Sequence, residues 1–125
     1  MFKNNIGIIL FENSKLHINL SNKYDKNSFI EFLDNLKKIY LMIGNNFEII
    51  SDLSNVNLFI IPTNVHFKIA KFFTENFTIS EKYLSKITII SKNSFICSIL
   101  NNFFKIYKTP HLIKFENSIN KIQSL

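Results

Sequence analysis

A short polar segment, Asp52 to Asn55, follows the apolar run Phe47 to Ser51 and supplies the best-placed candidates for chemistry in this sequence. Ligands of open α/β sheets usually bind at the carboxyl ends of strands, so the Asp52 carboxylate could contact a ligand or a partner protein. The same side chain could instead cap a turn by accepting a hydrogen bond from the nearby backbone. The sequence leaves both interpretations open.

Hydroxyl groups near this segment are candidate phosphate acceptors. Pro62 suits the first turn of a helix, because its fixed φ is already helical. Thr63 would then lie beside exposed helix N–H groups, which favour added negative charge. Phosphorylation of Thr63 would therefore be tolerated in the first turn of that helix. A threonine at this position also caps a helix without any modification, which is the alternative.

An apolar stretch precedes the predicted helix. Phe59, Ile60 and Ile61 are consecutive, and Phe67 falls outside the apolar stripe of that helix. Contiguous exposed apolar surface often marks a contact with a protein or a lipid. The alternative is that these side chains fold under the loop into the core. We expect the partner or ligand surface to comprise Asp52, Phe59, Ile60, Ile61, Thr63 and Phe67.

Metal, redox and nucleotide chemistry find no support in the sequence. His17, His66 and His111 lie in different predicted elements, and no His-x-x-x-His or Cys-x-x-Cys spacing is present. Cys97 has no assignable base beside it, which favours a small core residue over a nucleophile. With two glycines in the chain, a glycine-rich phosphate loop cannot form. We expect no cofactor, no metal and no enzymatic activity.

Composition limits the partners and the compartment. The formal net charge is +6, but every basic residue is a lysine, and the lysines are spread along the chain. Without arginine, bidentate reading of guanine is disfavoured, so we expect no sequence-specific nucleic-acid binding. Abundant Lys, Asn, Ile and Phe is also typical of AT-rich coding sequence, so codon drift is an alternative to a functional basic surface. The lone cysteine predicts a reducing compartment, and the N-terminal apolar run is too short for a secretory signal. No apolar stretch is long enough for a membrane span. We therefore expect a cytoplasmic protein.

Hydrophobic periodicity predicts the elements that must position these residues. Residues 7–11 and 15–20 are strand-like, and the short polar side chains of Glu12-Asn13-Ser14 between them favour a tight turn. The two strands therefore form a hairpin. In the second strand Leu16, Ile18 and Leu20 alternate with polar residues, as expected when one face is covered and the other is wet.

Helices and strands alternate after the hairpin. Apolar residues at helical spacing predict a helix over 28–42, and Gly44 follows where a left-handed cap is expected. Residues 47–51 lack a clear polar alternation, which predicts a central strand. The remaining predicted elements are a helix from Pro62, a short helix over 80–84, a strand over 87–91, a helix over 94–107, a strand over 112–115 and a helix over 117–124. This order predicts a single α/β domain over 1–125, with one mixed, mostly parallel five-stranded sheet, an N-terminal hairpin and flanking helices.

Four pieces of the sequence carry a resemblance to a known family. They are Phe47-Glu-Ile-Ile-Ser-Asp-Leu-Ser54, the segment from Ser94 through Asn101-Asn-Phe-Phe104, Lys108-Thr-Pro110, and Phe115 before a closing helix. In their order and spacing the chain resembles STAS-like (SpoIIAA-like) domains of the STAS/CRAL-TRIO superfamily along nearly its whole length. The resemblance implies a non-enzymatic regulatory or protein-interaction module, with another protein or a second copy of the chain as partner.

The chain departs from this family at one functional position. The better-known members, antagonists of anti-sigma factors, carry an Asp-Ser-Ser-Gly turn with a phosphorylated serine, whereas this chain has Phe59-Ile-Ile-Pro-Thr63 there. The resemblance then implies Thr63 as the first candidate phosphate acceptor and Ser54 as the second. The related CRAL-TRIO domains bind lipids, which makes a carrier of a small apolar ligand or lipid the alternative function. An enzyme with an unrecognised site is the third possibility.

Overall fold

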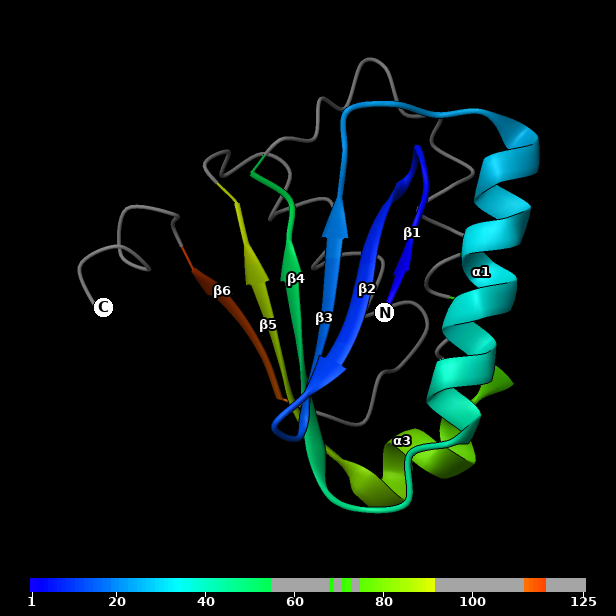
Figure 1. The fold of residues 1–125 in the computed structure, drawn as a ribbon. Helices are drawn as coiled ribbons and strands as arrows, with labels where there is room; N and C mark the ends of the chain where they lie inside the picture. The colour runs from blue at the N-terminus through cyan, green and yellow to red at the C-terminus, as the bar shows by residue number, and fades with distance from the viewer. Residues whose placement is uncertain (55–67, 69–70, 73–74, 92–111, 117–125) are drawn as a thin grey trace.

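The computed structural model describes residues 1–54, 68, 71–72, 75–91 and 112–116 (Figure 1). Their strands form one six-stranded sheet in chain order, made of β1 (Phe2–Lys3), β2 (Gly7–Glu12), β3 (Lys15–Leu20), β4 (Phe47–Asp52), β5 (Leu84–Ile90) and β6 (Leu112–Glu116). The pairings β1–β2 and β2–β3 are antiparallel, and β3–β4, β4–β5 and β5–β6 are parallel. The predicted α/β class, the single mixed sheet and the central position of β4 are confirmed. The two-residue β1 was not predicted, because it is too short to show a pattern.

The hairpin turn between β2 and β3 forms as predicted. Asn13 and Ser14 have φ of 53° and 60°, the left-handed conformation that a type I′ hairpin turn requires at both central residues. Glu12 consequently pairs with Lys15. The Ser14 carbonyl also accepts a hydrogen bond of 3.1 Å from the Glu48 N–H, which fixes the turn against the start of β4.

The helix α1 (Lys26–Leu41) begins two residues earlier than predicted. Asp25 is its N-cap and accepts a hydrogen bond of 2.8 Å from the Ser28 N–H. The predicted left-handed cap at Gly44 is wrong, since neither glycine has a positive φ. The helix ends instead with Met42 in a right-handed conformation, whose N–H bonds the Ile39 and Tyr40 carbonyls. These bonds satisfy the last carbonyls without a left-handed residue.

The short helix α3 (Phe77–Tyr83) leads directly into β5. The sequence placed Leu84 at the end of this helix, but Leu84 is the first residue of β5, where it pairs with Phe47 and is buried. A register shift between Phe47 and Glu48 leaves Ser85 as the extra residue of β5. The predicted helices from Pro62, over 94–107 and over 117–124 fall almost entirely outside the described residues.

One face of the sheet carries the core, and we call it the core face. The buried side chains of β2 to β5 on this face, such as Ile9, Leu16, Ile49 and Ile87, join those of α1 in one cluster. The Tyr40 ring of α1 meets the Phe72 ring edge-on at 5.5 Å, and Ile79 and Tyr83 of α3 pack against the same cluster. The connections from β3 to β4 and from β4 to β5 therefore both contribute to this face. Both crossovers run in the same direction along the sheet, and crossovers of the same hand then lie on the same face. None of the described helices is long and apolar enough to cross a membrane.

Candidate functional site

The face of the sheet opposite the core face carries ordered rows of side chains, and we call it the open face. The strand register defines three rows across it. They are a charged row of Glu12, Lys15, Glu48 and Lys86, a middle row of Leu10, His17, Ile50 and Thr88, and a far row of Ile8, Asn19, Asp52 and Ile90. Lys3 of β1 extends the far row, because it pairs with Ile8. Side chains of paired residues share a face, so each row forms a line across neighbouring strands.

The open face is accessible at one end and closed at the other. On β2 to β4 the apolar residues Leu10 and Ile50 are half-buried, and so is His17 between them. On β5, Thr88 and Ile90 are 6% and 2% exposed. All helical residues that pack on the described core cluster lie on the core face. Among the described residues, the exposed and half-buried side chains of this face lie on β1 to β4 and at Lys86 of β5.

The charged row contains a loosely paired triad. The Glu48 carboxylate lies 3.8 Å from the Lys15 Nζ and 3.9 Å from the Lys86 Nζ. Both distances exceed a normal hydrogen bond, and the side chains of the two lysines are 50% and 39% exposed. Such pairs contribute little to stability. They neutralise Glu48 while leaving most ammonium N–H donors of both lysines available to another group.

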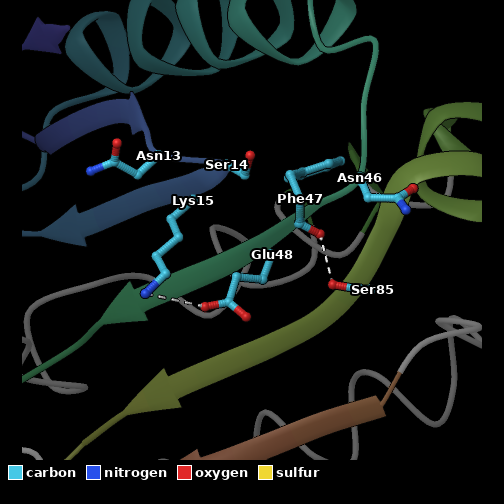
Figure 2. Close-up of a pocket in the computed structure, with 7 residues that line it drawn as sticks. All are labelled: Asn13, Ser14, Lys15, Asn46, Phe47, Glu48 and Ser85. Carbon is cyan, nitrogen blue, oxygen red and sulfur yellow. Dashed lines mark hydrogen bonds and ion pairs between the residues drawn. The ribbon is translucent and has the colours of Figure 1, made fainter.

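A shallow pocket of about 390 Å³ lies beside this triad, where β3, β4 and β5 begin (Figure 2). It is lined by Asn13, Ser14, Lys15, Asn46, Phe47, Glu48 and Ser85. Figure 2 shows the Lys15 and Glu48 side chains directed toward each other, while the Ser85 hydroxyl donates a hydrogen bond of 3.0 Å to the Phe47 carbonyl. Its lining contains no histidine or cysteine that could act as a base or a strong nucleophile. The pocket can offer hydrogen bonds and charge.

The predicted carboxylate, Asp52, ends β4 on the far row. Its Oδ1 accepts a hydrogen bond of 2.9 Å from the Ser54 N–H, which is the turn-capping role weighed above. The next residue, Leu53, donates its N–H to the Ile90 carbonyl at 2.8 Å, so the ends of β4 and β5 are held together. Asp52 is half-buried and belongs to the open face, while its contact with a ligand stays a prediction.

Most of the predicted surface lies outside the described residues. This applies to Phe59, Ile60, Ile61, Thr63 and Phe67, so the apolar patch and the first candidate phosphate acceptor stay predictions. The second candidate, Ser54, is described and is half-buried in the turn after β4. Of the described residues, no three His, Cys, Asp or Glu side chains come together as they would to hold a metal ion.

The three rows were not found from the sequence. Lys15, Glu48 and Lys86 are separated by dozens of residues, and only strand pairing brings them together. The available signal was the polar alternation of residues 15–20, which showed that β3 has a wet face but not which strands border it. Comparisons of the chain with protein-family models, curated proteins and solved structures give no significant match.

Proposed function

We propose that this chain is a STAS-like domain that acts as a non-catalytic regulatory or protein-interaction module in the cytoplasm. The supporting features are an α/β fold with an N-terminal hairpin and one mixed sheet, and the ordered rows of side chains on the open face. The proposed contact surface is the part of the open face on β1 to β4.

The observation that carries this proposal is the middle row of the open face. Leu10 on β2 and Ile50 on β4 are apolar and half-buried, and His17 on β3 lies between them. Charged side chains flank them, with Lys15 and Glu48 in the next row on one side. An apolar centre with a polar, solvated rim is the usual arrangement of a protein-binding surface.

The described charged groups support a binding role over a catalytic one. Glu48 is neutralised by two lysines, Asp52 caps a turn and Asp25 caps α1. Each of these three carboxylates thus already has a structural role. The apolar-carrier alternative gains no support from the described pocket, because Phe47 is the one apolar residue in its lining.

Site-specific photo-crosslinking tests the proposal. A photoreactive amino acid at position 10 places the probe on the middle row, and the same probe at Ile30 places it on the exposed surface of α1. We expect irradiation in the source cells to link position 10 to one defined protein, either another protein or this chain itself. The linked protein is then purified and its affinity for the pure chain is measured.

A charge inserted into the middle row provides the matched control. Leu10→Glu should weaken that affinity at least about tenfold, because it places a carboxylate among apolar contacts, whereas Ile30→Glu should leave it unchanged. Thermal melting of both variants shows that they remain folded. Equal crosslinking from positions 10 and 30, or equal affinities of the two variants, would contradict the proposed surface.

A further inference from the structure

We infer that the exposed side of α1 binds the same side of α1 in a second copy of this chain, with the two helices antiparallel. We call this side the outer face of α1. Its residues are all exposed, and they are Asn27, Ile30, Glu31, Asp34, Lys37, Lys38 and Leu41. Figure 1 shows α1 at one side of the fold, with the sheet on its inner side. The inference goes beyond the proposed function, which concerns the opposite face of the sheet.

Two large apolar side chains lie at the ends of the outer face. Ile30 is 46% exposed and Leu41 is 57% exposed. Asp34 and Lys37 lie between them, so the four residues follow one another at steps of four, three and four. This spacing keeps them on one side of a helix and is the spacing by which paired helices contact each other. The outer face therefore has the geometry of a helix-pairing surface.

The charges of the outer face are divided between its two halves. The half toward the N-terminus of α1 carries Glu31 and Asp34, and the half toward the C-terminus carries Lys37 and Lys38. None of the ion pairs among the described residues uses these four side chains. A surface with one acidic and one basic half is complementary to itself when the second copy is turned end to end.

The twofold axis of such a pair fixes which residues meet. The axis lies between the two helices, perpendicular to them, at the level midway between Asp34 and Lys37. Each contact then occurs twice, as in any isologous interface. The opposed residues are Asp34 with Lys37, Ile30 with Leu41 and, beside them, Glu31 with Lys38. The two helix dipoles are also antiparallel, which places each negative helix end near a positive one.

Other arrangements of the same two faces lose this complementarity. In a parallel pair, Asp34 would meet Asp34 and Lys37 would meet Lys37. An antiparallel pair moved by one helical turn in either direction would bring together the same like charges. A shift of two turns would place Ile30 opposite Asp34, or Leu41 opposite Lys37. The charge pattern and the apolar spacing thus select the same arrangement, and a second copy of the chain carries the matching pattern.

The size of the outer face predicts a weak dimer. Residues 27–41 span about 22 Å, and a contact about 10 Å wide covers about 220 Å² on each copy. Stable complexes bury about 800 Å² on each partner, so this contact is small. We expect a dissociation constant on the order of 0.1 to 1 mM.

Sedimentation equilibrium of the pure chain from about 10 μM to 1 mM measures this association. Asp34→Lys places a lysine opposite Lys37 of the other copy at both contacts, and should weaken association at least about fivefold. The double variant Asp34→Lys/Lys37→Asp keeps the composition and restores opposite charges at both contacts. Its dissociation constant should return to within about twofold of the original value. Glu81→Lys, which makes the same charge change at an exposed residue of α3, should weaken association by no more than about twofold.

Crosslinking of uncharged variants tests the orientation of the helices. In a Cys97→Ser background, chains with Ile30→Cys and chains with Leu41→Cys should be joined by a short bis-maleimide when they are mixed. Chains with Ile30→Cys alone should not be joined, because the two copies of position 30 lie about 16 Å apart along the helix axes. Joining of these chains to one another would indicate a parallel pair and overturn the inference. A chain that stays monomeric to 1 mM, or a double variant no tighter than Asp34→Lys, would also overturn it.

The dimer and the proposed function fail separately. At about 1 μM a dimer this weak is dissociated, so Ile30→Glu stays a valid control for Leu10→Glu when partner affinity is measured there. A photoreactive group at position 30 that captures a second, different protein would assign the outer face to that protein and overturn the inference. The absence of any protein linked at position 10 would refute the proposed function and leave the dimer unaffected.

Discussion

Replacing Gly7 by alanine tests how closely the first two long strands approach each other. Gly7 is buried in β2 and pairs with Leu20 of β3. A Cβ at this position would lie 2.1 Å from the Asn19 carbonyl oxygen and 3.0 Å from the Leu20 Cα. Favourable contacts of carbon begin at about 3.5 Å, so β2 and β3 would have to separate locally by more than 1 Å. The obstructing atoms belong to the backbone, which cannot turn aside as a flexible side chain would.

The expected cost follows from what this separation disrupts. The Gly7 carbonyl accepts a hydrogen bond of 3.0 Å from the Asn4 N–H, and the neighbouring Ile6 carbonyl accepts one of 2.8 Å from the Ser21 N–H. Overpacking a well-packed site costs about 1–3 kcal/mol, and weakened backbone hydrogen bonds add to this. We therefore expect Gly7→Ala to lower the free energy of unfolding by about 3 kcal/mol.

The second glycine of the chain provides the control. A Cβ at Gly44 would meet no atom within 4 Å, and Gly44 has no positive φ. Gly44→Ala should therefore leave stability unchanged or raise it by up to about 1 kcal/mol, because alanine restricts the unfolded chain. Urea unfolding followed by circular dichroism measures both variants. Equal stabilities of Gly7→Ala and the original chain, within about 0.5 kcal/mol, would refute the close approach of β2 and β3.

The remaining predictions concern α1 and the core. The backbone hydrogen bond from Ser28, with its side-chain hydrogen bond, lowers the pKa of Asp25 below its ordinary value of 3.8. The charged cap is therefore favoured in the folded state, so its stabilising effect is present above about pH 4 and is lost as the pH falls through the lowered pKa. Asp25→Ala should melt at a lower temperature than the original chain at pH 7, with the difference shrinking toward pH 2; a constant difference would argue against the charged cap. Tyr40→Ala should lower the free energy of unfolding in urea by about 3–5 kcal/mol, because Tyr40 is fully buried against Phe47 and Phe72. The control Ile30→Ala, at an exposed position, should lower it by about 0.5 kcal/mol or less. An equally small loss for Tyr40→Ala would contradict this packing.

Features that depend on neighbouring residues in the chain were predicted well. Alternation located β3, helical periodicity located α1 to within two residues, and the polar residues Asn13 and Ser14 gave the hairpin turn. Local steric and hydrophobic preferences suffice for such features, because the contacting groups are close in sequence. The predictions at Gly44 and Leu84 were wrong, and both residues fall at element ends, where a few tertiary contacts outweigh local preference.

The candidate site could be predicted only in part, for the same physical reason. The sequence placed Asp52 at the end of a central strand, and β4 does end there. It could not show that the Asp52 carboxylate is bonded to the Ser54 N–H, since Asp-x-Ser segments adopt several turns. The surface predicted around Phe59 to Phe67 remains to be tested.

The sequence by itself determined that the chain forms an α/β fold with a hairpin followed by helical crossovers, since each of these rests on patterns within single segments. Only the tertiary structure decided that Lys15, Glu48 and Lys86 form one row, because their juxtaposition requires the register of three strands. It also decided that α1, Phe72 and α3 pack on the same face, while the middle row on β2 to β4 lies half-buried on the other. Strand register is set by the burial of a whole sheet face, and a shift of one residue would exchange the core and open faces. The proposed contact surface is therefore a property of the assembled sheet and is absent from any of its strands alone.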